Sequence, residues 1–541
     1  MDGGRVCGGR EKARRVFDWL IYFPNIIMQQ KKSFQNALKW SYISNWGERG
    51  FSALFTFILA GILGPRDFGM VAICVVYIAF LQMFLDQGFV AALIQRKEID
   101  QDHLDAVFWM DVALGFFLVV LSLTFSGKWA ALNHSPEIAR IIPVLTLSIL
   151  LEALATVQSA LLRREMDFKS LSLRTNIAVV AGGLVGVGMA VAGFRVWSLV
   201  GQQIARDLTG LALLWRLSPW RPRLEFSWRH FSSLMGFSVP NFAAQLGVFA
   251  SGQADSILLG LLFGPVAVGL YRLADRVVGT VLSIATASVQ AVSFPEFSRL
   301  QKRPGELRKS VIACVRLGSV ASMPPLAGLA AVGVPLMAVL GSKWTPASGV
   351  VKILCAAGML SVFTLFTGPL LQALGRPRQF AVLEWARTVL SIAILVAAGL
   401  MVRDRPVEGQ ISGIAGARFV IVALFVAPVF VYLLVRLSGA SLRELAVTVR
   451  PSAISALAVL AAVAVFEFSG WLKSAPPVIL LAAEAALGAG VGLTVLLVLE
   501  TQLRQSLAGL LERSLRRWAT PREVEAPPPC ELSGVDGTHD A

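Results

Sequence analysis

The sequence predicts an all-α polytopic membrane protein in which about fourteen transmembrane helices form two six-helix lobes followed by two C-terminal helices. Three observations predict this fold: the composition, the spacing of apolar runs and a repeated turn. Of the 541 residues, 55% are hydrophobic and 15% are charged, and the mean hydropathy is +0.67. Since a soluble chain carries about 25% charged residues, the deficit favours a membrane protein.

Apolar runs of spanning length occur from one end of the chain to the other. A spanning helix needs about 20 mostly apolar residues. Six runs make up the first set: Ile43–Leu63, Phe68–Ile94, Ala106–Phe125, Ile138–Leu162, Thr175–Phe194 and Trp197–Leu217. Eight more follow: Leu234–Phe263, Val266–Phe294, Val311–Leu340, Val350–Ala373, Phe380–Val402, Ile414–Val435, Pro451–Phe468 and Pro477–Leu499.

Basic residues gather in every second loop between these runs. With the N-terminus inside, the cytoplasmic loops hold about 20 Lys or Arg and the external loops about 8, which is the positive-inside pattern. We therefore expect a multi-pass protein of the bacterial plasma (inner) membrane with both termini in the cytoplasm. The same pattern accounts for the net charge of +15, so we expect no nucleic-acid partner.

A repeated turn predicts the division into lobes. The first run ends at Gly64-Pro65 and the seventh at Gly264-Pro265, and each turn reads Gly-Pro-x-x-x-Gly. Because six helices separate the two copies, both halves keep the same orientation. The predicted organisation is a basic cytoplasmic extension (1–37), a first lobe (38–217), a basic linker (218–233), a second lobe (234–436), two appended helices (437–500) and a cytoplasmic tail without ordered structure (501–541).

Ionisable side chains inside the predicted spans are the candidates for function. Each costs about 2.5–3.5 kcal/mol at membrane depth, so it usually faces a partner or a wet cavity. The candidate cavity residues that bind substrate are Arg49, Arg206, Asp207, Asp255, Arg272, Asp275, Arg276 and Arg418. The helical hairpin at Gly264-Pro265 predicts that Asp255 lies at the same depth as Asp275 and Arg276.

Some of these charges have a simpler explanation. Arg49, Asp86 and Arg316 lie about two turns from the predicted cytoplasmic ends of their helices, and Glu384 with Arg387 forms an i, i+3 pair. Snorkelling or a structural ion pair explains such residues without a substrate. The 200-residue offset places Phe55 opposite Asp255 and Ala72 opposite Arg272, so the charged cluster has no image in the first lobe.

Several functional classes lack their sequence signals. No Gly-x-x-x-x-Gly-Lys-Ser/Thr loop is present, which disfavours direct ATP hydrolysis. The five cysteines and four histidines are dispersed, so neither a disulfide framework nor a metal centre is predicted. External loops of about a dozen residues are short for an enzyme site. We expect no cofactor and no enzymatic activity.

Motifs in both halves resemble the Wzx-type polysaccharide and O-antigen flippases of the multidrug, oligosaccharidyl-lipid and polysaccharide (MOP) exporter superfamily, in particular their lipopolysaccharide-biosynthesis branch. The resemblance covers about 38–436 and rests on the order and spacing of several segments. They are Leu63-Gly64-Pro65-Arg-Asp-Phe-Gly69, Asp86-Gln-Gly88, Arg163-Arg164-Glu-Met-Asp-Phe168-Lys169, Asp255-Ser-Ile-Leu-Leu-Gly260, Gly269-Leu-Tyr271-Arg, Phe294-Pro295-Glu-Phe-Ser298-Arg299, Gly341-Ser-Lys343-Trp344 and Gly375-Arg376-Pro377.

The resemblance implies two helical bundles around a central cavity that move a polyprenyl-diphosphate-linked glycan across the membrane by alternating access. It also implies contact with membrane lipids, a lipid-tail groove at the two appended helices, and other polysaccharide-assembly proteins as partners. The chain departs from the family pattern at Gly61 and Gly252, where relatives often carry arginine. Substrate contacts are therefore not transferred from relatives residue by residue.

Two alternatives remain open at this stage. A proton- or sodium-coupled multidrug or cation antiporter would share the fold and use an acidic residue such as Asp86 or Asp255. A polytopic glycosyltransferase, polymerase or ligase would need a longer catalytic loop than the sequence offers.

Overall fold

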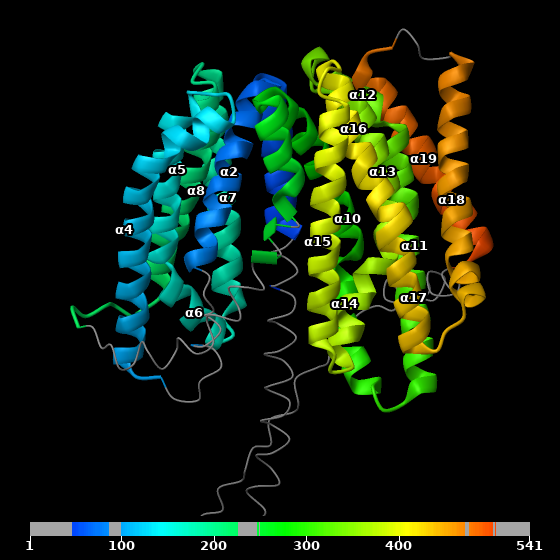
Figure 1. The fold of residues 1–541 in the computed structure, drawn as a ribbon, viewed down its shortest axis with the longest axis horizontal. Helices are drawn as coiled ribbons and strands as arrows, with labels where there is room; N and C mark the ends of the chain where they lie inside the picture. Colours follow the sequence, from blue (N-terminus) through cyan, green and yellow to red (C-terminus); the bar gives the residue numbers. More distant parts are fainter. Residues whose placement is uncertain are drawn as a thin grey trace, which may run out of the picture.

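The computed structural model describes residues 40, 46–85, 93, 99–225, 246–247, 249–250, 252–470, 475–500 and 504. Within these ranges the chain folds into two helical lobes that stand side by side, with α18 and α19 at the outer edge of the second (Figure 1). The predicted N-terminal extension, most of the predicted tail and part of the predicted linker lie outside the described residues.

In the described part of the chain the first lobe contains six helical segments. Residues 46–62 form the first helix. The others are α2 (Pro65–Leu85), α4 (Gln101–Leu132), the bent pair α5 (Ile138–Ala153) and α6 (Thr156–Arg164), α7 (Phe168–Val191) and α8 (Val196–Leu217).

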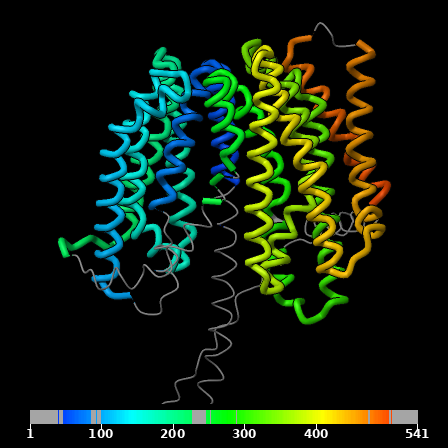
Figure 2. Tube along the Cα trace, in the orientation of Figure 1, coloured from blue at the N-terminus to red at the C-terminus, as the bar shows by residue number. Residues whose placement is uncertain are grey.

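The second lobe repeats this plan with more interruptions, as the chain trace of Figure 2 shows. Its first helix in the described part of the chain includes Gly252–Phe263. The helices that follow are α10 (Pro265–Leu300), α11 (Pro304–Ala331), α12 (Gly333–Val339), η1 (Ser342–Ala347), α13 (Ser348–Leu360), η2 (Ser361–Phe363), α14 (Thr364–Ala373), α15 (Pro377–Met401), α16 (Val407–Val420), η3 (Ile421–Val426) and α17 (Ala427–Ser438). The appended pair is α18 (Leu442–Ser469) and α19 (Pro477–Leu499).

Where the structure describes them, the fourteen predicted apolar runs coincide with helical segments. In the described ranges nine helices are long and apolar enough to cross a membrane, or eleven when each of two bent pairs counts as one span. Helix 46–62, the helix Gly252–Phe263 and α8 account for the remaining runs. Polar side chains such as Arg206 and Asp207 lower the hydropathy of α8. The chain is an all-helical polytopic membrane protein, as the sequence predicts.

Several helices extend beyond the apolar runs that predict them, and at α18 the local reason is visible. The thirteenth helix was predicted to begin at Pro451, but α18 begins at Leu442 and contains that proline. A capping box starts it: the Ser441 hydroxyl accepts from the Glu444 backbone N–H at 3.1 Å, and the Glu444 carboxylate accepts from the Ser441 N–H at 2.9 Å. These two bonds give acceptors to backbone N–H groups that would otherwise lack one at the start of the helix. The helix can therefore start before the apolar run.

The two Gly-Pro turns lie against each other where the lobes meet. Pro65 begins α2 and Pro265 begins α10, positions at which a helix needs no N–H donor. One turn later, a Cβ on Gly69 would lie 1.6 Å from the Pro265 carbonyl oxygen, and one on Gly269 would lie 1.9 Å from that of Pro65. The backbones of α2 and α10 are therefore in direct contact at both glycines, and only glycine leaves room for that contact.

Each lobe also binds the end of the other lobe's first helix. The Trp344 indole of η1, which is fully buried, donates to the Ala60 carbonyl at 2.7 Å and packs edge-on against Phe68. In the opposite sense, the His134 Nε2 after α4 lies 3.2 Å from the Leu261 carbonyl oxygen. The last carbonyls of a helix lack intrahelical partners, so these contacts satisfy them while closing the lobes together at this end.

Candidate functional site

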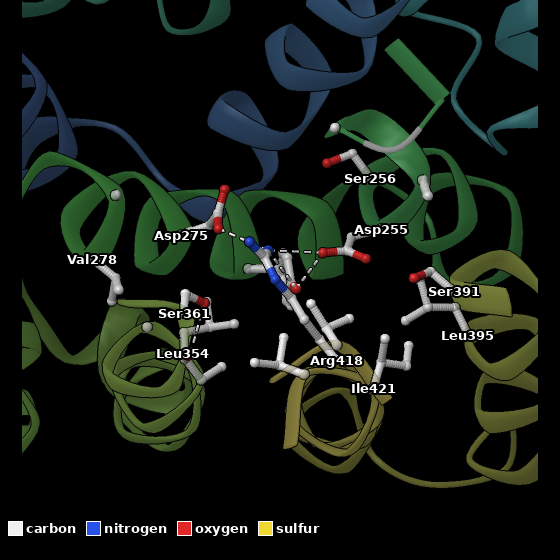
Figure 3. A pocket seen from close by; sticks show the side chains of 18 of the residues that line it. Asp255, Ser256, Asp275, Val278, Leu354, Ser361, Ser391, Leu395, Arg418 and Ile421 are labelled. Carbon is white, nitrogen blue, oxygen red and sulfur yellow. Dashed lines mark hydrogen bonds and ion pairs between the residues drawn. The ribbon is translucent and has the colours of Figure 1, made fainter. Parts of the chain in front are cut away.

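A polar cavity of about 320 Å³ lies inside the second lobe. Its walls come from the helix Gly252–Phe263, α10, α13, α15, α16 and η3 (Figure 3). Four of the eight predicted site residues line it: Asp255, Arg272, Asp275 and Arg418. The cavity thus gathers charges from segments that are more than 160 residues apart in the sequence.

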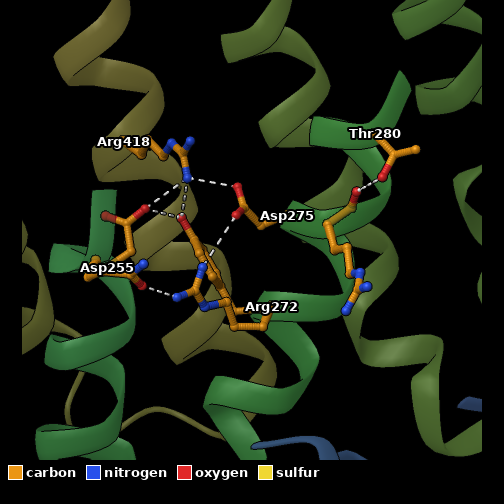
Figure 4. Close-up of polar contacts among 8 residues, drawn as sticks. Asp255, Arg272, Asp275, Thr280 and Arg418 are labelled. Atoms are coloured by element: carbon orange, nitrogen blue, oxygen red, sulfur yellow. Dashed lines mark hydrogen bonds and ion pairs between the residues drawn. The ribbon is translucent and has the colours of Figure 1, made fainter. Parts of the chain in front are cut away.

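Arg418 is the centre of the ionic network in this cavity. One of its nitrogens, Nη1, donates at 2.9 Å to Asp255 Oδ2 and at 2.9 Å to Asp275 Oδ1, as Figure 4 shows. The Tyr271 hydroxyl donates to the same Asp255 oxygen at 2.7 Å. The hairpin at Gly264-Pro265 therefore places Asp255 and Asp275 at one depth, where a single guanidinium joins them.

Two further arginines border the cavity. Arg272 donates to the Gln253 side-chain oxygen and lies 3.9 Å from Asp275. Arg387 forms the predicted i, i+3 ion pair with Glu384 at 2.6 Å, yet it also lines the cavity. The negative charge of the carboxylates in this network equals the positive charge of its arginines. A bound anion therefore has to compete with Asp255 and Asp275 for the guanidinium groups.

A break in helix geometry follows Arg418 directly. Residues Ile421–Val426 form η3, a π-helical segment between α16 and α17, and Ile421, Val422 and Val426 line the cavity. Such segments interrupt the regular hydrogen-bond ladder and often mark functional sites in helices.

A second group of charges lies at the seam between the lobes. Arg276, which is exposed, donates to the Ser52 hydroxyl of the first lobe at 2.7 Å. Among the described residues no carboxylate lies within 4.0 Å of Arg276. Arg206 of the first lobe and Arg272 of the second both lie within electrostatic reach of it. This seam therefore has excess positive charge.

Arg206 and Asp207 are adjacent in α8 but have different partners. Arg206 donates to Glu48 at 2.6 Å across the first lobe, and both side chains are 36% exposed. The Gln203 amide donates to both Asp207 oxygens, at 3.0 and 3.1 Å. Successive residues of a helix point about 100° apart, which explains the separation.

The other predicted residues have separate positions. Arg49, like Arg206, Asp207 and Arg276, does not line the second-lobe cavity, and its buried Nη1 has no hydrogen-bond partner within the described ranges. Asp86 lies outside the described residues. In the part of the chain that the structure describes, no group of three His, Cys, Asp or Glu residues is placed to hold a metal ion.

Sequence reasoning missed three contributors to these networks. Tyr271 was noted only within a family motif, and neither Glu48 nor Gln253 was singled out. Neutral polar side chains carry no charge that marks them in an apolar run, so Tyr271, a donor, and Gln253, an acceptor, had little to mark them. Glu48 lies near the start of the predicted run Ile43–Leu63, where an acidic residue is ordinary.

Comparison with known proteins identifies the family. The profile described as "Polysaccharide biosynthesis protein" matches residues 58–349, more than half of the chain, and the chain belongs to this family. It is 28% identical to the succinoglycan biosynthesis transport protein ExoT of Rhizobium meliloti (strain 1021), over 67% of this chain and 73% of that protein. The resemblance to Wzx-type polysaccharide biosynthesis proteins is thereby confirmed.

Solved structures share the fold. The lipid II flippase MurJ in an inward closed conformation has a TM-score of 0.67 at 11% identity and covers 87% of this chain and 100% of its own. An inward-facing multidrug resistance MATE transporter has a TM-score of 0.58 at 16% identity, over 72% of this chain and 95% of its own. The chain is therefore a polytopic membrane protein of a polysaccharide biosynthesis family and shares the fold of these transporters.

Proposed function

We propose that this protein is a flippase that moves a polyprenyl-diphosphate-linked glycan across the bacterial plasma membrane by alternating access, for the assembly of lipopolysaccharide, exopolysaccharide or capsule. Moving a sugar diphosphate through hydrocarbon would cost of the order of tens of kcal/mol. A carrier of this cargo has to offer a polar path to the head group and leave the tail in lipid. A charged seam between two helical lobes suits that task.

The observation that carries the proposal is the uncompensated positive charge at the seam. Arg276 faces the first lobe, bonds to a neutral hydroxyl and lies near Arg206 and Arg272. Guanidinium groups bind phosphate oxygens through short, charge-assisted hydrogen bonds that are often bidentate. A diphosphate placed here would contact both lobes, and their relative movement would change its surroundings.

The second-lobe cavity supports an asymmetric cargo site. Arg418 is held by Asp255 and Asp275, so we propose that it orients the cavity wall and contacts the cargo only after the ion pairs rearrange. Arg272, bonded to the neutral Gln253 and 3.9 Å from Asp275, is easier to redirect toward an anion. In this proposal, Arg276 and Arg272 make the first contacts with the diphosphate.

The appended helices suit the lipid part of the cargo. Both present large exposed apolar side chains, among them Leu457 and Val465 on α18 and Val478 and Ile479 on α19. An exposed apolar surface on this pair fits the expected groove for a polyprenyl tail. Membrane lipids and other polysaccharide-assembly proteins are the further partners we propose.

We also propose the orientation that the loop charges predict. Both termini then lie in the cytoplasm, and the Gly-Pro turns face the outside. The end of the molecule closed by Gly69, Gly269 and Trp344 is then the outer end. The cargo would enter between the lobes from the cytoplasm.

Deletion of the gene tests the proposal. We expect loss of surface polysaccharide and accumulation of polyprenyl-linked glycan on the cytoplasmic side, in a strain without a second transporter of this type. Complementation with Arg276→Met should fail, whereas Arg299→Met should restore export because Arg299 forms only an exposed ion pair with Glu296. Normal surface glycan with no trapped intermediate in the deletion strain would overturn the proposal.

The antiporter alternative has less support from the described residues. A cation-exchanging carboxylate needs to be accessible to its ion, but Asp255 already accepts hydrogen bonds from Tyr271 and Arg418. The shared fold with MATE transporters does not separate the two functions, because a likeness at 16% identity concerns the fold alone. A drug-resistance assay in the deletion strain distinguishes them: unchanged resistance is expected.

A further inference from the structure

One ionisable side chain inside the spans belongs to neither charged group. Glu484 lies in α19, and none of its surface is exposed. Both of its carboxyl oxygens are buried, and within the described ranges neither has a hydrogen-bond partner. It lies in the appended pair, away from the seam and the cavity.

The packing of α19 explains why Glu484 is covered. The buried residues of this helix are Glu484, Gly488, Gly492 and Leu496, which repeat every four positions and share one face. On that face a Cβ on Gly488 would lie 3.3 Å from Val459 of α18, and Ser455 of α18 donates to the Gly492 carbonyl at 2.9 Å. Two glycines thus bring the helices close together and carry Glu484 into their contact.

The groups that face Glu484 are few. Glu467 on α18 and Lys352 on α13 act on it electrostatically, and both side chains are exposed. The neighbouring α12 contains no ionisable residue. On α11 the ionisable residues Glu306, Arg308, Lys309 and Arg316 precede Pro324, which is the residue near Gly492 of α19. Among the described residues no cation is therefore bonded to Glu484, although Lys352 lies within electrostatic reach.

An ionised carboxylate in this environment would be very costly. Burial of an unpaired charge costs several kcal/mol even after relaxation, and the group avoids that cost by binding a proton. Glu467, an acid of like charge, adds to the preference for the neutral form, and the exposed Lys352 opposes it.

We propose that Glu484 is a proton-binding site within the membrane, which is protonated when α19 packs on α18 as seen here and releases its proton when the carboxylate turns toward Lys352. The ligand of this site is a proton. Because Lys352 belongs to the second lobe, a change in proton occupancy changes the attraction between α19 and that lobe. The coupling of this step to transport rests on the proposed function, whereas proton binding itself does not.

Infrared spectroscopy of the purified protein in lipid nanodiscs tests proton binding without any cargo. We expect a carbonyl stretching band of a protonated carboxylic acid at neutral pH that disappears in Glu484→Gln and persists in Glu467→Gln. The first variant keeps the shape of the side chain, and size-exclusion chromatography checks that both variants fold. An identical acid band in the wild type and in Glu484→Gln would overturn the proposal.

A second variant separates proton binding from a hidden ion pair. Lys352→Met should leave the Glu484 acid band in place and extend it to higher pH, because the cation that opposes protonation is gone. If Glu484 is instead ionised and paired with Lys352, the wild type lacks the band and Lys352→Met creates it, which contradicts the proposal.

Export in cells tests the coupling. Glu484→Gln cannot release a proton, so we expect surface glycan to fall by about tenfold or more relative to Glu467→Gln, if release is required in each cycle. Wild-type export by Glu484→Gln would overturn the coupling. Absence of export by the wild-type protein itself would instead count against the proposed function.

Discussion

Both lobes contribute equivalent residues to the contact between them, the joint at Gly69 and Gly269, but only the second lobe carries the charged cluster. Gly69 and Gly269 lie at equivalent positions near the starts of α2 and α10, and each is in close contact with the backbone of the other lobe. Two hundred residues before Asp255 and Arg272, however, the first lobe carries Phe55, which is buried, and Ala72. The repeated part of the sequence thus builds the contact between lobes, and the part that diverged builds the ionic network. The features that both lobes share form the contact between the lobes, and the features found in only one lobe form the candidate site.

The largest expected effect is on the joint. Gly269→Ala places a methyl group against the backbone carbonyl of Pro65, which cannot move as a side chain can. We expect a loss of about 3 kcal/mol, the upper part of the range for overpacking, measured by thermal unfolding in detergent. Gly61→Ala is the matched control because open space surrounds that position. An unchanged unfolding temperature in Gly269→Ala would show that the lobes do not meet at this glycine.

The next effect concerns the asymmetric network. Arg418→Met leaves Asp255 and Asp275 without their shared cation, and we expect a loss of about 2 kcal/mol. This is less than for a fully buried pair because the Arg418 side chain is 40% exposed toward the cavity. Thermal unfolding measures it against Arg403→Met, since Arg403 is exposed and forms no ion pair among the described residues. Equal stability of the two variants would contradict a structural role for Arg418.

A smaller effect is expected where η1 caps the first helix of the other lobe. Trp344→Phe keeps an aromatic side chain but removes the N–H that donates to Ala60 and part of the buried indole, at a cost of about 1.5 kcal/mol. Trp215→Phe is the control, because it removes a similar bond to Leu154 within one lobe. Electron spin resonance distances between labels at positions 66 and 266 should gain a longer component only in Trp344→Phe. Unchanged distances would mean that Trp344 does not hold the lobes together.

The smallest effect is expected for the ion pair in the first lobe. Arg206 and Glu48 are each 36% exposed, so water screens their attraction. A double-mutant cycle with Arg206→Met and Glu48→Gln should give a coupling free energy of about 0.5 kcal/mol. A coupling of about 2 kcal/mol or more would mean that the first lobe contains a tightly held network like that of Arg418.

The fold could be predicted because helices that cross a membrane need long apolar runs, which are easy to recognise along the sequence. Within the described residues the apolar runs coincide with helices, and the Gly-Pro repeat marks the joint at Gly69 and Gly269. The start of α18 was less predictable, because the Ser441 capping box lies outside the apolar run.

The candidate site could be predicted only in part. The hairpin geometry brings Asp255 and Asp275 together as expected, and Glu384 pairs with Arg387 at helical spacing. That Arg418 joins the two aspartates follows from packing between distant helices, which no periodicity in the sequence encodes. The use of the eight predicted residues in substrate binding remains a prediction.

Three residues of α10 illustrate the remaining difficulty. Arg272, Asp275 and Arg276 share one helix face by spacing, yet Arg272 and Asp275 line the second-lobe cavity while Arg276 reaches Ser52 of the first lobe. The partner of a long side chain depends on which groups lie near it in the folded protein, and the sequence alone does not show which groups these are. Glu484 did carry a usable signal, since it is an ionisable residue in the middle of an apolar run.

Binding of a polyprenyl diphosphate to the purified protein in nanodiscs tests the central claim most directly, because it isolates recognition of the anionic head group from every other step. We expect the wild type and Arg299→Met to bind this lipid with similar affinity, and Arg276→Met to bind about tenfold or more weakly, since it loses a charge-assisted contact of about 1.5–3 kcal/mol. Equal affinity of all three proteins would contradict a diphosphate site at the seam between the lobes.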